Sequence, residues 1–128
     1  MKSTFEILDV LYLILNESKI PGLISGIIYK GSVDSKSQKE DIEINVLTNP
    51  NGYLQAGIAN INFYCLDSTI NLPNTKRMKE IIMELIKLLD NKSRDNFFFQ
   101  VENQTGPFKD QDRDKMHYAN IRLTYQTI

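Results

Sequence analysis

The sequence predicts an α+β fold, a two-layer sandwich with two helices on one face of about five mostly antiparallel strands. Two segments, about 4–16 and 75–91, carry apolar residues at helical spacing. Five other segments are apolar or alternate like strands. The resulting order is α-β-β-β-α-β-β with short polar connections, which favours antiparallel neighbours and a single covered sheet face.

The first predicted helix is apolar almost all round. Ser3 and Glu6 form a capping-box pattern at its start. One stripe carries Phe5, Leu8, Leu11, Tyr12 and Leu15, and further apolar positions are Ile7, Val10, Leu13 and Ile14. A helix of this kind is buried on more than one side, which suggests a partner subunit.

Three strands are expected next, over 23–30, 41–47 and 53–67, with a polar, mobile loop over 31–40. Alternation predicts two inward sets: Ile42, Ile44 and Val46, then Ala59, Ile61, Phe63 and Cys65. The opposite sheet face is apolar in part, at Leu54, Ala56, Ile58 and Phe98. No predicted layer covers it, so another copy of the chain is the simplest cover.

The second helix is the clearest amphipathic element of the sequence. Its apolar stripe is Met78, Ile81, Ile82, Leu85, Leu88 and Leu89. Strands are expected over 96–102 and 116–127, joined by a charged loop over 103–115. Their inward residues should be Phe97, Phe99, Val101, Ala119, Ile121, Leu123 and Tyr125.

Composition limits the classes of protein. With 128 residues, residues 1–128 form one domain. A net charge of −1 argues against a dedicated nucleic-acid binder. No apolar run has the length to span a bilayer, and no cleavable signal pattern opens the chain. We therefore expect a cytosolic protein with no membrane contact.

Catalytic and metal-binding patterns are weak. Cys65 lies in a strand and is expected to be buried, while His117, the lone histidine, is expected to be a partly exposed strand residue. The acidic run from Asp110 resembles the start of a calcium loop, but Lys115 and Ile121 stand where glycine and glutamate are needed. We expect no enzyme activity, no cofactor and no metal. An enzyme that uses His117 remains a third, weaker hypothesis.

Lys76, Arg77 and Lys79 crowd the first turn of the second helix, where the helix dipole disfavours cations by ~0.3–1 kcal/mol each. This cost is small enough for a solvated helix end. The alternative is an acidic patch on a neighbouring subunit, or passing nucleic acid. Acidic residues are available at Asp110, Asp112 and Asp114, and at Glu40 and Asp41.

Four segments, "KEDIEINVL", "GYLQAGIANINFYCLD", "LPNTKRMKEI" and "DKMHYANIRLTY", resemble in order and spacing the tail-completion, or tail-terminator, proteins of tailed bacteriophages and prophages. The resemblance runs from about Gln38 to Tyr125. The N-terminal part is shorter than in that family.

The resemblance implies an α+β sandwich that forms a ring, typically a hexamer, at the head-proximal end of the tail. Such a ring stops tube growth, contacts the tail tube protein and the head connector, and lets DNA pass through its lumen. No catalytic residue or cofactor carries over. The loops over 31–40 and 102–115 are where ring or tube contacts are expected. The alternative is a small dimeric adaptor or regulatory domain that binds a peptide or ligand on its open sheet face.

Overall fold

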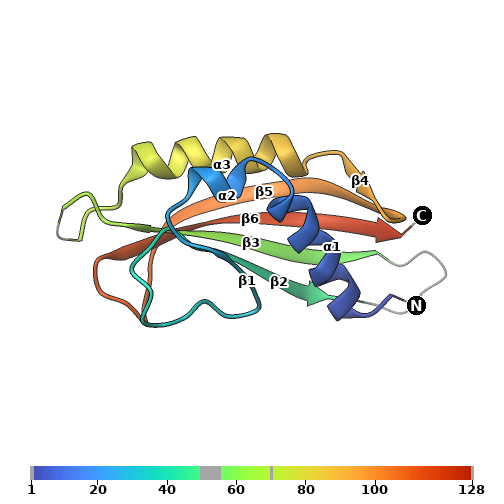
Figure 1. The fold of residues 1–128 in the computed structure, drawn as a ribbon, viewed down its shortest axis with the longest axis horizontal. Helices are drawn as coiled ribbons and strands as arrows, with labels where there is room; N and C mark the ends of the chain where they lie inside the picture. The colour runs from blue at the N-terminus through green and yellow to red at the C-terminus, as the bar shows by residue number, and fades with distance from the viewer. Residues whose placement is uncertain (1, 50–55, 70, 128) are drawn as a thin grey trace.

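The computed structural model describes residues 2–49, 56–69 and 71–127 (Figure 1). Its elements, in chain order, are α1 (Thr4–Asn16), α2 (Ile20–Leu23), β1 (Ile28–Lys30), β2 (Ile42–Thr48), β3 (Ala56–Leu66), α3 (Thr75–Leu89), β4 (Lys92–Arg94), β5 (Phe97–Lys109) and β6 (Met116–Thr127). No helix in these ranges is long and apolar enough to cross a membrane.

The strands form one sheet in the order β1-β2-β3-β6-β5-β4. Among the described strands, β1 and β2 pair in parallel, and the other four pairings are antiparallel. α1 packs over β1 and β2, while α3 packs over β3, β6 and β5 (Figure 1). Both helices contribute to one hydrophobic core with the sheet, so the α+β prediction is confirmed.

Two details of that prediction are wrong. Over the described residues the sheet has six strands, because Lys92–Arg94 adds the edge strand β4. The segment expected as a strand over 23–30 begins instead as the end of a short helix, α2, and only Ile28–Lys30 pairs with β2. Pro21 lies in the first turn of α2, where its fixed φ favours the helical conformation.

α1 has the predicted bounds and cap, but part of the predicted stripe is wrong. The Glu6 amide donates to Ser3 Oγ at 3.2 Å, and the Ser3 amide donates to Glu6 Oε1 at 3.2 Å. The buried residues are Ile7, Val10, Leu11, Ile14 and Leu15. Phe5, which was expected on the buried stripe, is 75% exposed. A helix that is apolar all round has no polar face to mark which side meets the sheet.

α3 matches its predicted stripe closely. Its buried residues are Met78, Ile81, Ile82, Leu85 and Leu89, and Leu88 packs partly buried against the core. The helix ends at Leu89, two residues earlier than expected, because Asp90 is extended and Asn91 adopts a positive φ. Asn74 caps the start by accepting a hydrogen bond from the Arg77 amide.

The predicted charged loop over 103–115 is largely wrong, because β5 continues to Lys109. The extension pairs with β6 through two register shifts, and only residues 110–115 connect the strands. Residues 102–108 are all exposed. A strand with neither face buried has no hydrophobic alternation, so its composition is typical of a loop.

The inward residues of the central strands are confirmed. Ile42, Ile44, Ala59, Ile61, Phe63, Cys65, Phe97, Phe99, Ala119, Ile121, Leu123 and Tyr125 are buried in the core, and Val46 and Val101 pack partly buried against it. The antiparallel registers place β3 and β6 side by side over their whole length. These two strands therefore carry the centre of the core.

Candidate interaction surfaces

The basic start of α3 contains one arginine that is bound within the chain and two exposed lysines. Arg77 Nε donates to Glu40 Oε2 at 2.6 Å and Nη2 to Glu40 Oε1 at 2.9 Å, and Nη2 also donates to the Leu23 carbonyl. The hydrogen bond from Arg77 is the main cause that holds the pKa of Glu40 below its ordinary value. Lys76 and Lys79 are exposed and have no ion-pair partner in the described part of the chain.

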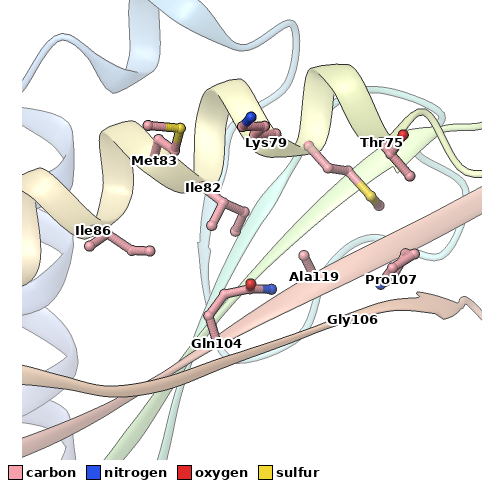
Figure 2. Close-up of a pocket in the computed structure, with 10 residues that line it drawn as sticks. Thr75, Lys79, Ile82, Met83, Ile86, Gln104, Gly106, Pro107 and Ala119 are labelled. Carbon is pink, nitrogen blue, oxygen red and sulfur yellow. The ribbon is translucent and has the colours of Figure 1, made fainter.

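A groove with a volume of about 270 Å³ lies between α3 and β5, and Lys79 is part of its lining (Figure 2). We call it the α3 groove. Ile82 and Ile86 face Gln104 and Ala119 across it. Its full lining is Thr75, Met78, Lys79, Ile82, Met83, Ile86, Gln104, Gly106, Pro107 and Ala119. The wall from α3 is mostly apolar, and its methionines are side chains that adapt to the shape of a partner.

The α3 groove exists because β5 brings small or polar residues beneath the helix. After Val101 the strand presents Gln104 and Gly106 where a filled core would need large apolar side chains. Gly106 adopts φ +118°, and a Cβ there would lie 3.0 Å from Ala119 Cα. Glycine at this position therefore lets β5 approach β6 closely and leaves space under α3.

The acidic residues predicted as contacts also differ in whether they are bound within the chain or exposed. We call residues 110–115 the acidic loop. Asp110 is buried and its Oδ2 accepts from Arg113 Nε at 2.7 Å. Asp112 and Asp114 are exposed, with no ion-pair partner in the described residues. Of the acidic residues predicted as contacts in this loop, Asp112 and Asp114 are therefore the exposed ones, and Lys115 beside them is exposed as well. No group of three or more His, Cys, Asp or Glu side chains in the described ranges is placed to hold a metal ion.

A buried polar network fixes the acidic loop to the loop between β1 and β2. Arg113 Nη1 donates to the Ser37 carbonyl at 2.9 Å and lies 3.7 Å from Asp41 Oδ2. Asp41 is fully buried and also accepts hydrogen bonds from the Ser37 hydroxyl at 2.5 Å and the Ile27 amide at 3.0 Å. The Arg113 guanidinium lies 4.7 Å from the centre of the Tyr64 ring. Two loops far apart in sequence are therefore held as one unit.

The open sheet face is polar and aromatic rather than apolar over its described centre. Glu43 Oε1 accepts hydrogen bonds from Asn45, Asn62 and Tyr64, and Asn120 donates to Asn62 at 2.8 Å. The rings of Tyr64 and Phe108 lie 5.2 and 5.4 Å from that of Tyr118.

The predicted apolar half of this face is only partly described. Ala56 is exposed, while Ile58 and Phe98 are half-buried. Leu54 lies outside the described residues. The described members of this predicted set are therefore one small exposed side chain and two half-buried ones.

His117 is buried, so the expectation of a partly exposed residue is wrong. Its Nδ1 lies 2.6 Å from Asp67 Oδ1, and Cys65 is its neighbour across the strand pair. Cys65 is buried as predicted, and burial raises the pKa of its thiol to about 11. The raised pKa favours the protonated thiol, which is a poor nucleophile.

The sequence pattern missed the α3 groove and the arginine contacts. Gln104 and Gly106 lay in a predicted loop, and nothing in the local pattern around Arg77 or Arg113 indicates a partner 37 or 76 residues away. No family model matches this chain, and no curated protein matches it.

Proposed function

We propose that this chain is a structural protein of a tailed bacteriophage or prophage, which forms a ring that completes the tail tube and joins it to the head connector. The observation that carries the proposal is that opposite edges of one sheet present unlike, exposed surfaces. The edge at β1 has Ile27, which is 59% exposed. Toward the other edge, where β5 and β6 precede β4 in the strand order, lies the α3 groove with Lys79.

The difference between the two edges bears on the symmetry of an assembly. A two-fold dimer uses the same patch on both subunits, whereas contact between two unlike patches produces a ring or an open filament. A ring component needs two different contact surfaces on each subunit, and the two edges of this sheet differ. The proposed role also requires no cofactor. The family resemblance implies where the protein would be found. It would assemble in the host cytoplasm and then form part of the virion tail.

The partners follow from the same proposal. Copies of the chain would form the ring, which we expect to be a hexamer. The tail tube protein and the head connector would meet its two ends, and DNA would pass transiently through the lumen. The loop over 31–40 and the acidic loop are held together by Arg113, which gives one end of each subunit a fixed shape to present to those neighbours.

The test is native mass spectrometry of the full chain over a concentration series, with negative-stain images. A closed ring of about six copies supports the proposal. If the free chain is monomeric, it should still bind purified tail tubes lacking their terminator and leave tube length fixed. A chain that neither closes a ring nor binds tubes would contradict the proposed function.

A dimeric adaptor is the second candidate, and the open sheet face favours it. Tyr64, Tyr118 and Phe108 form an aromatic cluster beside the amides of Asn62 and Asn120, a combination that suits a peptide. A stable dimer whose peptide binding is lost in Tyr118→Ala would favour this function. Phe5→Ala, at an exposed site outside this face, is the matched control.

A further inference from the structure

We infer that the outer edge of β5 is closed to strand addition, so that any partner meets this side of the sheet through side chains and not through main-chain hydrogen bonds. We call residues 100–109 of β5 the free edge. The inference goes beyond the proposed function, because it concerns the kind of contact that this edge permits, with or without a ring.

The free edge is long enough to pair with another strand. β4 pairs with β5 at Phe97, Phe98 and Phe99, and no other described strand lies on the outer side of β5. β5 itself continues to Lys109. An unpaired edge presents a row of main-chain N–H and C=O groups, which is a template for pairing with another chain. A sheet with such an edge needs features that prevent the pairing.

The backbone of the free edge is irregular in two places. The register with β6 shifts between Val101 and Asn103, where Glu102 is an extra residue of β5. It shifts again within residues 105–108, where β5 once more has one residue more than the facing part of β6. Bulges of this kind bend a strand and increase its local twist. A regular strand therefore cannot stay in register along the outer side of β5.

Main-chain groups of the free edge are also occupied or missing. Asp90 Oδ1 accepts a hydrogen bond from the Val101 amide at 2.9 Å. The side-chain amide of Gln104 donates to the Thr105 carbonyl at 2.8 Å. Pro107 has no N–H to donate, which is why proline within sheets is confined to edges and bulges. Side chains of the chain itself thus take hydrogen bonds that an added strand would need.

The strands at the two ends of the sheet are protected by their length. β1 and β4 have three residues each, so either can offer few main-chain hydrogen bonds to a partner. Arg94, the last residue of β4, is also bound to Glu17 of its own chain. Self-association of this protein, including the proposed ring, should therefore depend on contacts between side chains.

Deleting Glu102 and Pro107 together from the full chain tests the role of the bulges. Without these residues β5 has as many residues between Val101 and Phe108 as the facing part of β6, so the edge becomes regular. The double deletion should strengthen self-association at least about tenfold by sedimentation equilibrium, with a rise in thioflavin T fluorescence that reports pairing between chains.

A second variant tests the occupied groups without changing the chain length. Asp90→Ala with Gln104→Val frees the two main-chain groups that these side chains bind, and should strengthen self-association at least about threefold. Asp9→Ala with Gln111→Val is the matched control, because it changes the same residue types at exposed positions outside β5. Circular dichroism checks that each variant is folded. If the double deletion does not fold, the second variant decides.

Hydrogen exchange of the wild type completes the test. Stronger self-association of the folded variants, with unchanged exchange at residues 103–108 in wild-type assemblies, supports the inference. Folded variants that associate no more than the wild type overturn it. A wild-type ring in which the amides of residues 103–108 become more protected than in the monomer also overturns it, and leaves the proposed function intact. Wild-type chains that form no ring and bind no tail tube, while the variants self-associate, support this inference and contradict the proposed function.

Discussion

Arg77 and Glu40 form a two-point ion pair that joins the start of α3 to the residue before Asp41, with N–O distances of 2.6 and 2.9 Å. The side chains are only 28% and 17% exposed. The exposed Lys76 and Lys79 lie near Arg77 in the first turn of α3, and the buried Asp41 follows Glu40. The contribution of the Arg77–Glu40 pair to the free energy of unfolding can be measured separately from assembly.

Glu40→Gln should lower the free energy of unfolding by about 1–2 kcal/mol, because Arg77 keeps its charge and loses its carboxylate partner. Urea unfolding of the purified chain measures this change. Glu80→Gln is the control: Glu80 contacts the same arginine at 3.3 Å but is 53% exposed, so its loss should cost less than about 0.5 kcal/mol. Equal effects of the two changes would contradict the prediction.

The contribution of Glu40 should depend on pH. Arg77 holds the pKa of Glu40 below the ordinary 4.5, so the folded state binds fewer protons than the unfolded state in this range. The stabilisation is present above about pH 4.5 and is lost as the pH falls through the lowered pKa. The difference in unfolding free energy between wild type and Glu40→Gln should therefore shrink with acidification below that value. A difference that is constant from pH 7 to pH 3 would refute this assignment.

Arg113→Met should destabilise the fold strongly, by about 3 kcal/mol, since it leaves Asp110 and Asp41 buried without their cation. Thermal and urea unfolding measure the loss. Asp112→Asn changes an exposed carboxylate in the same loop and should shift the free energy of unfolding by less than about 0.5 kcal/mol. If Arg113→Met lowers the free energy of unfolding no more than Asp112→Asn does, the buried network does not hold the two loops together.

Gly57→Ala should cost about 3 kcal/mol or more, because the added Cβ would meet backbone as well as a fixed ring. It would lie 2.2 Å from the Thr48 carbonyl oxygen and 2.5 Å from Tyr125 Oη. Gly22→Ala is the matched change, with nothing within 4 Å of its Cβ, and should leave stability unchanged or slightly higher. Urea unfolding of both variants gives the comparison, and similar values for the two would count against the packing argument.

Cys65 should react slowly in the folded protein at pH 8, because burial raises the pKa of its thiol to about 11 and little thiolate is present. Labelling with a thiol reagent, with and without denaturant, measures the rate. Folded chains should label many times more slowly than unfolded ones, and His117→Ala should not slow the labelling further. Fast labelling that depends on His117 would revive the enzyme hypothesis.

Patterns within single segments of the sequence predicted much of this fold. The capping box at Ser3 and Glu6 marked the start of α1, and the stripe of α3 predicted its buried face, because both patterns depend on residues within one helical turn. The inward faces of β2, β3 and β6 followed from alternation, since successive side chains of a strand point to opposite sides. In each case the signal and its cause lie in the same segment.

Tertiary structure decided the rest. The exposed half of β5 had no alternation, because nothing covers either face, and α1 had no polar side to show that Phe5 would stay exposed. The sequence showed clusters of charge but not which members were free. Arg77 and Arg113 pair with Glu40 and Asp41, which are distant in the sequence, whereas Lys76, Lys79, Asp112 and Asp114 have no ion-pair partner among the described residues. Pairing of that kind depends on distances that only the packed chain fixes.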